Sequence, residues 1–505
     1  MKTITSATLI VFSIVLCTNH SWGFPDAVKI WDANGVPVTE AAGNQHRPVS
    51  TSDGAGGAII VWEDWRDENR GGDIYGQRVG AEGGVLWAQD GVSFGSANKP
   101  DGQPASHSDP AIIADGYGGG ILTWTDDRSM QGDVYAQRIN ASGDIHWQSQ
   151  GIPICTACYQ GGLCANGKHL PQIISDGTGG AIITWYEVRD GFHLSVWAQR
   201  VKHDGTVAWT LDGVPVAYGS FYADFPKTLS DGMGGAIIAW QDNRNANGFQ
   251  IYTQRIDNNG VAQWATNGIK ISPAIGERGS RGHSMVSDGA GGAIIVWVDR
   301  RNFEDANIFA QKIDLNGQTQ WQTDGVPICT RSMEQYAPTC ATDRSGGAII
   351  AWEDQGASPP GSGQQWIYAQ RISATGGLLW TVDGIPIYTN HGFSPNVVTD
   401  GVSGAYIVWN ATIIVDPFFH IPSVFAQHVG GGGQTLWQSG GFQVYGEPYG
   451  HYGHESKAVS DGAGGVIIHW KDYRNTNTYW DIFAQRLTDS RRRAMPWLLL
   501  LQNNY

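Results

Sequence analysis

The sequence has little positive charge, and beyond its first residues it has no long hydrophobic run. Lys and Arg together number 32 against 47 Asp and Glu, which gives a formal net charge of −15. Nucleic acids and anionic membranes attract patches of Lys and Arg, yet the one basic run is Arg491 to Arg493. The apolar run Trp497 to Leu501 is far shorter than the roughly 20 residues of a membrane span. We therefore expect no nucleic-acid partner and no integral membrane span.

The motifs of common catalytic and cofactor sites are also missing. There is no G-x-S-x-G, no H-E-x-x-H and no EF-hand loop, and the carboxylates are spread too evenly to select an acid/base pair. The glycine-rich stretch SDGAGGAIIVWED departs from the dinucleotide fingerprint, because Ile59 stands at the third glycine position. A β-branched run follows it instead of the helix that would face a phosphate. The sequence thus predicts no catalytic residues, no bound cofactor and no metal.

Cysteines are few, and their spacing leaves two hypotheses open. Cys155, Cys158 and Cys164 lie close together in one long connection, with His169 after them. This spacing suits either a zinc site or a disulfide with a spare thiol; export favours the disulfide, with Cys155 and Cys164 as candidates. A second disulfide is expected from two further cysteines that flank another connection, Cys329 and Cys340.

The first 23 residues have the pattern of a secretory signal peptide. Lys2 precedes an apolar run from Ala7 to Leu16, and small residues allow cleavage after Gly23. We therefore expect an exported protein, either secreted or held in the periplasm or at the cell surface. The predicted domain spans residues 24–488, and residues 489–505 form a C-terminal tail.

A repeat organises the whole domain. An Asp in a glycine-rich turn is followed nine residues later by a Trp, and this happens eight times. The pairs are Asp53/Trp62, Asp115/Trp124, Asp176/Trp185, Asp231/Trp240, Asp288/Trp297, Asp343/Trp352, Asp400/Trp409 and Asp461/Trp470. The apolar residues between turn and Trp are typical of a buried strand. Repetition at this period indicates an architecture built from copies of one unit.

Each unit continues with an aromatic-x-Gln element and, ten residues after the Gln, another Trp. The last unit lacks this second Trp, but the segment WDANGVPV, Trp31 to Val38, precedes the first unit and supplies it. When the N-terminal segment supplies the outer element that the last unit lacks, the first and last units join and the chain closes into a ring. Closure of this kind removes exposed sheet edges. The sequence therefore predicts an all-β fold: one eight-bladed β-propeller with four-stranded blades, closed by the N-terminal segment. We place the outermost strand around the second Trp, and we expect the Trp residues to pack between blades.

Variation in length is confined to two connections of each unit, from the first Trp to the Gln and from the outer element to the next Asp. In an up-and-down blade both emerge on the same face, which we call the long-loop face. Loops on a rigid scaffold commonly carry function. Two late segments there are rich in aromatics and His, VDPFFHIP and YGEPYGHYGH, and two further aromatics lie nearby. The candidate ligand-binding residues are Phe418, Phe419, His420, Tyr445, Tyr449, His451, Tyr452, Trp65 and Tyr473.

These aromatic segments suit sugar stacking or a protein partner, although packing of one loop on another would explain them equally well. The recurrent acidic-Arg pairs after the second strand, such as Asp64/Arg66 and Asp127/Arg128, fit local ion pairs better than a ring of anion ligands. The row of Gln residues is better explained by buried hydrogen bonding than by ligand binding.

Two parts of the repeat resemble known families. DVYAQRINASGDIHW, Asp133 to Trp147, resembles the tryptophan-docking repeat of quinoprotein dehydrogenases and of outer-membrane assembly propeller lipoproteins. The dehydrogenase resemblance would imply pyrroloquinoline quinone, calcium and a disulfide between adjacent cysteines, and this chain has no adjacent pair. The DGxGGAIIVWxDxR part is more similar to repeats of secreted bacterial proteins without assigned activity. The sialidase Asp-box resembles Asp204 to Trp209 in spacing, but Gly205 directly follows the Asp.

The sequence as a whole favours an exported, monomeric binding or scaffold module rather than an enzyme. Its ligand, a protein or a glycan, is expected on the long-loop face. The alternative is a carbohydrate-active enzyme, a glycosidase or lyase, that uses the same face; a quinoprotein-type oxidoreductase is less favoured.

Overall fold

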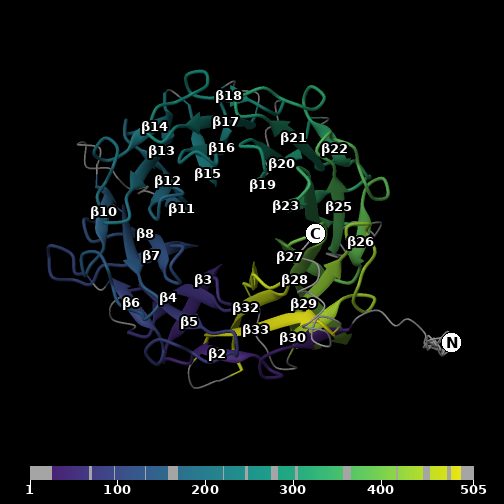
Figure 1. Ribbon diagram of the computed structural model, residues 1–505, viewed down its shortest axis with the longest axis horizontal. Helices are drawn as coiled ribbons and strands as arrows, with labels where there is room; N and C mark the ends of the chain where they lie inside the picture. Colours follow the sequence, from purple (N-terminus) through teal and green to yellow (C-terminus); the bar gives the residue numbers. More distant parts are fainter. Residues whose placement is uncertain are drawn as a thin grey trace, which may run out of the picture.

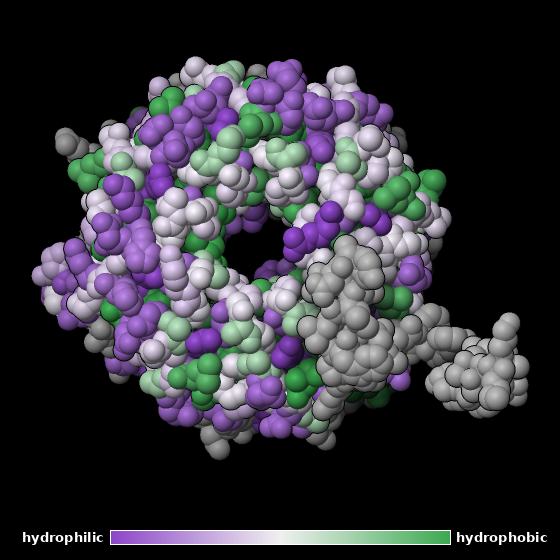
Figure 2. Space-filling view, viewed as in Figure 1, coloured by the Kyte–Doolittle hydropathy of each residue, from purple (hydrophilic) through white to green (hydrophobic). Residues whose placement is uncertain are grey.

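The structure is a ring of eight β-sheets (Figure 1), and the space-filling view shows a channel open at its centre (Figure 2). This computed structural model describes residues 26–490 except 68–70, 96, 131, 157–168, 220, 245–247, 274–281, 302–304, 357–364, 417–418, 447–454 and 475–478. The eight-bladed β-propeller predicted from the repeats is confirmed. No helix within these residues is long and apolar enough to cross a membrane.

Seven blades consist of four consecutive antiparallel strands that run from the channel outward. The first four blades are β3 (Asn44–Ser52), β4 (Ala58–Trp65), β5 (Asp73–Val79), β6 (Val92–Gly95); β7 (His107–Ala114), β8 (Gly120–Asp126), β9 (Asp133–Ile139), β10 (Ile152–Cys155); β11 (His169–Ser175), β12 (Ala181–Val188), β13 (Leu194–Val201), β14 (Val214–Ala217); β15 (Ala223–Ser230), β16 (Ala236–Asp242), β17 (Gln250–Ile256), β18 (Ile269–Lys270). The next three are β19 (His283–Ser287), β20 (Ala293–Asp299), β21 (Asn307–Ile313), β22 (Val326–Cys329); β23 (Gln335–Thr342), β24 (Ala348–Asp354), β25 (Trp366–Ile372), β26 (Ile385–Tyr388); β27 (Gly392–Thr399), β28 (Ala405–Asp416), β29 (Phe419–Val429), β30 (Phe442–Gly446).

The eighth blade joins the two ends of the chain. Its inner strands are β31 (Lys457–Ser460), β32 (Val466–Asp472) and β33 (Asp481–Asp489), and its outer edge comes from β1 (Ala27–Lys29) and β2 (Val36–Thr39). Both N-terminal strands pair antiparallel with β33, for example Val36 with Ala484. The predicted closure of the ring by the N-terminal segment is therefore confirmed. We call the junction of the eighth and first blades the seam.

The glycine-rich turns join the inner strand of each blade to the second strand, and all have the same length. In the first blade Asp53 Oδ1 accepts the N–H groups of Ala55 and Gly57, both at 2.8 Å. A Cβ on Gly57 would lie 2.2 Å from the carbonyl oxygen of Val79, so only glycine fits there. Asp53 Oδ2 also accepts from Arg78 of the third strand at 2.9 Å. These contacts explain why the turn sequence recurs: the turn residues hold the strands of each blade together, and they do not form a phosphate-binding loop.

The conserved spacing of ten between Gln and Trp reflects a buried hydrogen bond. In the second blade Gln137 Oε1 accepts the backbone N–H of Trp147 at 3.0 Å, and its amide donates to the carbonyl of Gln148. Gln137 is fully buried, so these contacts satisfy groups that would be costly to leave unpaired. The predicted role of the Gln row in buried hydrogen bonding is confirmed. The Trp itself lies in the tight turn that precedes the outer strand, so our placement of that strand around the Trp was wrong.

Each of these Trp residues docks on the next blade. Trp87 Nε1 donates to the carbonyl of Ala141 at 3.1 Å, and its ring covers Gly143. A Cβ on Gly143 would lie 2.9 Å from that ring, and the residue has φ +90°, so glycine is required twice over. The predicted packing of Trp between blades is confirmed, and it fixes the angle of each blade to the next.

A second buried set pairs Asp with Arg at the end of the second strand. Asp64 is buried, accepts from Trp62 Nε1 at 2.7 Å and binds Arg66 through both oxygens. The Arg66 guanidinium in turn stacks over Tyr75 at 3.7 Å. These are local ion pairs, as predicted, but their carboxylates are buried rather than exposed. In the second blade the partner of Arg128 is Asp126, not Asp127 as we had paired it.

The predicted disulfide between Cys329 and Cys340 is wrong. Cys329 is buried on the outermost strand of the fifth blade, whereas Cys340 lies on the innermost strand of the sixth blade, so the width of a blade separates them. The Cys340 thiol instead contacts Ser284 Oγ at 3.3 Å. Cys158 and Cys164 lie outside the described residues, so the hypotheses for the first cysteine cluster stay predictions.

A buried His bridges the first and second blades. His107 is fully buried, and its Nδ1 and Nε2 each lie 3.1 Å from a carboxylate, those of Asp73 and Asp126. Burial opposes the charged imidazolium, but hydrogen bonds and the charges of the two carboxylates outweigh it and raise the His107 pKa to about 9. The protonated side chain therefore acts as a clamp between two neighbouring blades.

We predict that this clamp makes stability depend on pH in the alkaline direction. A folded-state pKa above the unfolded value near 6.5 gives a stabilisation that is complete below pH 6.5 and is lost as pH rises through about 9. At about 1.4 kcal/mol per pH unit, the loss should reach at most about 3 kcal/mol. Urea unfolding from pH 6 to 10 should show this fall for the native chain and a flatter profile for His107→Gln. Equal slopes for both proteins would contradict the assignment.

Candidate functional site

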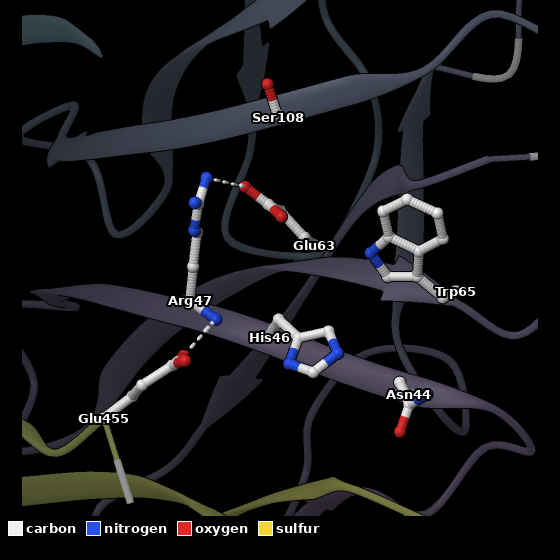
Figure 3. Close-up of a pocket in the computed structure, with 7 residues that line it drawn as sticks. All are labelled: Asn44, His46, Arg47, Glu63, Trp65, Ser108 and Glu455. Atoms are coloured by element: carbon white, nitrogen blue, oxygen red, sulfur yellow. Dashed lines mark hydrogen bonds and ion pairs between the residues drawn. The ribbon is translucent and has the colours of Figure 1, made fainter. Parts of the chain in front are cut away.

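A pocket of about 680 Å³ opens at the seam, on the long-loop face. It is lined by residues of three consecutive blades around the ring closure (Figure 3). The first blade contributes most of the wall, the second blade one side chain and the segment before β31 another. The lining residues are Asn44, His46, Arg47, Glu63, Trp65, Ser108 and Glu455.

An irregular turn of the backbone presents the charged side chains at this rim. The pairing of β3 with β4 shifts register between His46 and Val49, and Arg47 within this bulge has φ +49°. Asp109 on β7 and Glu455 before β31 have the same left-handed backbone, at φ +54° and +40°. All three stand six residues before the turn Asp of their blades. The bulge interrupts the regular ladder, so a side chain at this position projects from the mouth of the ring.

Arg47 is the centre of the charge network. Its Nη1 lies 2.8 Å from Asp109 Oδ1 and 3.2 Å from Glu63 Oε1, while its backbone N–H donates to Glu455 Oε2 at 2.6 Å. Figure 3 shows Arg47 between Glu63 on one side and Glu455 on the other. One residue of the first blade thus ties together carboxylates from the second and eighth blades.

The seam differs from two other blade interfaces at the residue after the second-strand Trp. In the first and sixth blades this residue is a glutamate that accepts the bulge N–H of the next blade: Glu63 accepts from Asp109, and Glu353 accepts from Ser394. In the eighth blade this position is Lys471, which has no acceptor. Glu455 takes over the role, and Lys471 Nζ binds its other oxygen at 2.9 Å. The substitution brings an extra Lys–Glu pair into the pocket wall.

The pKa values of the two pocket glutamates are shifted in opposite directions. Burial raises the pKa of Glu63, and its contacts with the Asp109 N–H and with Arg47 only partly offset this. Burial would also raise the pKa of Glu455, but the hydrogen bond and charge of Lys471 outweigh it and lower that pKa. Burial and the neighbouring Lys471 lower the pKa of His46, so its imidazole is neutral at pH 7. The pocket therefore contains one carboxyl with a raised pKa, one carboxylate with a lowered pKa and a neutral imidazole.

Trp65 forms the outer wall of this polar pocket. It is the last residue of β4, paired with Asn44, and its side chain is 36% exposed. The indole packs on Gly72, where an added Cβ would lie 3.0 Å from the ring, so its position is fixed by the backbone beneath it. A flat, partly exposed aromatic beside several hydrogen-bonding groups is the usual composition of a small-ligand pocket.

Of the predicted ligand-binding residues that the structure describes, Trp65 is the one that lines this pocket. Tyr473 is half-buried and lies 5.2 Å from the ring of Trp480, whose carbonyl accepts the N–H of Gln45 on β3. It therefore belongs to the same seam but not to the pocket wall.

The remaining predicted residues are placed differently. Tyr445 is buried, stacks on Trp470 and donates its hydroxyl to Asp472 at 3.0 Å, so we assign it to the core between blades. The segment we had taken for a loop around His420 is a β-ribbon, because β28 and β29 extend beyond the usual blade length. His420 is exposed on it, and Phe419 lies at the start of β29. The other predicted residues, Phe418, Tyr449, His451 and Tyr452, lie outside the described residues.

Sequence reasoning missed Asn44, His46, Arg47, Glu63, Ser108 and Glu455. A signal was available in the repeat itself. Six residues before each turn Asp, Arg47, Asp109 and Glu455 are charged, whereas the other five blades carry uncharged residues: Leu170, Phe225, Gly282, Ala337 and Ser394. Comparing the repeats column by column would have located this charged arc. Among the described residues, no group of three or more His, Cys, Asp or Glu side chains could hold a metal ion.

No protein-family model matches the chain, and no curated protein matches it by sequence. Several solved structures align with it at low similarity. The polysaccharide lyase Uly1 aligns with a TM-score of 0.45 at 10% identity over 92% of this chain and 99% of that one. The GH93 α-L-arabinofuranosidase of Fusarium graminearum aligns with 0.36 at 10% identity over 79% and 96%. A puromycin-hydrolyzing peptidase of Mycobacterium tuberculosis aligns with 0.42 at 10% identity over 90% and 63%. All three TM-scores are below 0.5.

We predict opposite effects on stability when each pocket glutamate is replaced by its neutral amide. Because the folded pKa of Glu63 is raised, its ionised form costs stability at pH 7, and Glu63→Gln should not lower the free energy of unfolding. Because the folded pKa of Glu455 is lowered, it stabilises the fold above its unfolded pKa. Glu455→Gln should therefore destabilise at pH 7, with the difference fading as pH falls below about 4. Urea unfolding of both variants at pH 7 and at about pH 3 measures this; the reverse order at pH 7 would refute it.

Proposed function

We propose that the long-loop face is a glycan-binding surface and that the seam pocket is its binding site. One observation supports this most: Trp65 stands partly exposed beside a row of fixed polar groups. The C–H face of a sugar ring stacks on an indole, while its hydroxyls need donors and acceptors at set positions. His46, Arg47 and Glu63 offer both kinds of group. We further propose that the chain performs this role as an exported module, in keeping with the signal-like N-terminus.

The size of the site favours a glycan over a protein ligand. A cavity of about 680 Å³ lies in the range of small-ligand pockets, roughly 300–1,000 Å³. A stable protein partner would instead need about 800 Å² of surface on each side. Rigid support also matters, because Arg47 and Glu63 are fixed by contacts from neighbouring blades before any ligand arrives. Preorganised groups of this kind lose little entropy on binding.

We predict that Trp65→Ala weakens oligosaccharide binding at least tenfold, about 1.4 kcal/mol, because it removes the stacking surface. A glycan array with the purified chain identifies the ligand, and calorimetry with the best-binding oligosaccharide measures affinity. The control is Tyr117→Ala, since Tyr117 is 69% exposed in a glycine turn on the opposite face. Equal affinity of native and Trp65→Ala proteins, or equal losses for both variants, would remove the pocket from consideration.

A carbohydrate-active enzyme is the second candidate, and one specific observation favours it. Glu63 tends to keep its proton and Glu455 to lose its own, and carboxyls separated in this way can serve as general acid and general base. Glu63 would then protonate the leaving oxygen of a glycosidic bond, and Glu455 would activate the attacking water. The polysaccharide lyase and the arabinofuranosidase reported above are carbohydrate-active enzymes by name. Their likeness to this chain concerns the architecture only.

Turnover assays separate binding from catalysis. If the protein cleaves glycans by hydrolysis, new reducing ends should appear on incubation with the array ligand, and Glu63→Gln should abolish them while binding persists. A lyase would instead give an unsaturated product detected by ultraviolet absorbance. Unchanged release of product by Glu63→Gln would exclude Glu63 as the acid, and no product from the native chain would leave the binding function alone.

A further inference from the structure

The central channel contains two lysines that take no part in the seam pocket. Lys227 lies in the middle of β15 and Lys457 begins β31, and both side chains are exposed. Each strand is the innermost of its blade, so an exposed side chain there faces the channel, which Figure 2 shows open at the centre of the ring. Both lysines stand four residues before the turn Asp of their blades, Asp231 and Asp461. They therefore lie at the same level along the channel.

The ring places these two lysines opposite one another. β15 belongs to the fourth blade and β31 to the eighth, which are half a turn apart in an eight-bladed ring (Figure 1). Their charges interact despite a separation of 230 positions in the chain. Both side chains reach solvent, but the surrounding channel wall removes part of their hydration; this desolvation first, and then the charge of Lys457, lowers the pKa of Lys227, while desolvation also lowers the pKa of Lys457 and Glu455 opposes this. The placement itself follows from the exposure of both side chains on innermost strands of opposite blades.

No carboxylate at this level neutralises the pair. From the fourth residue before the turn Asp to the turn itself, the eight inner strands read VSTS, AIIA, QIIS, KTLS, SMVS, TCAT, NVVT and KAVS, with no other charged side chain. Among the described residues, neither lysine forms an ion pair or a hydrogen bond with another side chain. The charge of Glu455 acts on Lys457, but this carboxylate already binds Lys471. Two unpaired cations in a confined space are a costly arrangement unless an anion completes it.

The rest of this level supplies neutral hydrogen-bonding groups. The equivalent positions in four other blades are polar: Gln172, Ser284, Thr339 and Asn396. Asn396 Oδ1 accepts the N–H of Ala458 at 3.0 Å, which leaves its amide NH₂ as a donor. Two ammonium groups with amide and hydroxyl donors around them match the needs of an oxyanion. The positive site is notable in a chain whose formal net charge is −15.

We propose that Lys227 and Lys457 form an oxyanion-binding site in the central channel, separate from the seam pocket. The ligand is a sulfate, phosphate or carboxylate group held between the two ammonium groups. It is either a free inorganic ion or an acidic group carried on a sugar. This site does not depend on the proposed glycan-binding function, because a free anion is enough to occupy it.

The test compares anion binding by the full chain with that of two variants taken from its own repeats. Lys227→Gln places at this level the residue that the third blade has there, Gln172, and Lys457→Asn places the residue of the seventh blade, Asn396. Both should fold with an unfolding temperature no lower than that of the native chain in anion-poor buffer, because each removes an unpaired charge. Lys270→Gln is the control, since Lys270 is exposed on the outer strand β18.

Sodium sulfate is titrated at constant ionic strength and followed by calorimetry and by the unfolding temperature. We expect saturable binding to the native chain and to Lys270→Gln, and at least tenfold weaker binding to each channel variant. Proton uptake should accompany binding at alkaline pH, because the anion restores the ammonium form of both lysines. Glucuronate forms the second arm: tighter binding than sulfate identifies a sugar acid as the ligand, and tighter binding of sulfate identifies an inorganic ion. Affinities for both anions that are equal in native and channel variants, or no saturable binding to the native chain, would overturn the proposal.

Discussion

The hydrogen bond between the Trp31 N–H and the side chain of Gln485 is the contact on which the closed ring depends. At 3.1 Å it repeats across the chain ends the contact that seven other Gln–Trp pairs make within a single hairpin. The amide of Gln485 also donates to the carbonyl of Asp32, and Trp31 Nε1 reaches the turn of the first blade at Ala81. The N-terminal segment therefore enters the eighth blade as an ordinary outer element. Without it, β33 would be an open edge that invites pairing with other chains.

The blades on both sides of the eighth depart from the repeat in individual contacts. Each Trp of the third element normally docks on a glycine turn in the next blade, but Trp437 of the seventh blade meets the end of β33. Trp437 instead donates to the carboxylate of Asp489, which also binds His428. On the long-loop face, Lys471 stands where the first and sixth blades have an accepting glutamate, and Glu455 binds both Lys471 and the Arg47 N–H. Eight identical blades would offer eight identical surfaces. The blades at the closure differ from the others, and the pocket lies where they differ.

Much of the fold could be predicted from the sequence because the constant spacings within the repeat reflect its hydrogen-bonded turns and hairpins. The spacing of nine residues between Asp and Trp is the length of one turn plus one strand. The spacing of ten residues between Gln and Trp is the length of one hairpin. The displaced outer strand and the Asp126 pairing are local errors within a correct unit. The Cys329–Cys340 disulfide was wrong because proximity of two connection ends along the chain says nothing of the blade width between them.

The candidate site could be predicted only in part. Trp65 was among the aromatic candidates on the long-loop face, and it lines the pocket. Arg47, Glu63 and Glu455 were missed because they meet only when the first and eighth blades are joined, and charged residues at strand ends resemble ordinary surface. Tyr445 was misjudged for the opposite reason: an aromatic near a loop was taken as exposed, whereas its ring fills the gap above Trp470. Burial and neighbours across a closed ring are properties that no local pattern encodes.

The central claim is that one junction both closes the ring and forms the binding site. Hydrogen–deuterium exchange of the full chain, with and without a saturating oligosaccharide selected on a glycan array, tests it most directly. We expect ligand protection in peptides that cover the start of β3, the end of β4 and the segment entering β31, with the remaining blades unchanged. Protection confined to the glycine turns of the opposite face, or spread equally over the eight blades, would contradict the account.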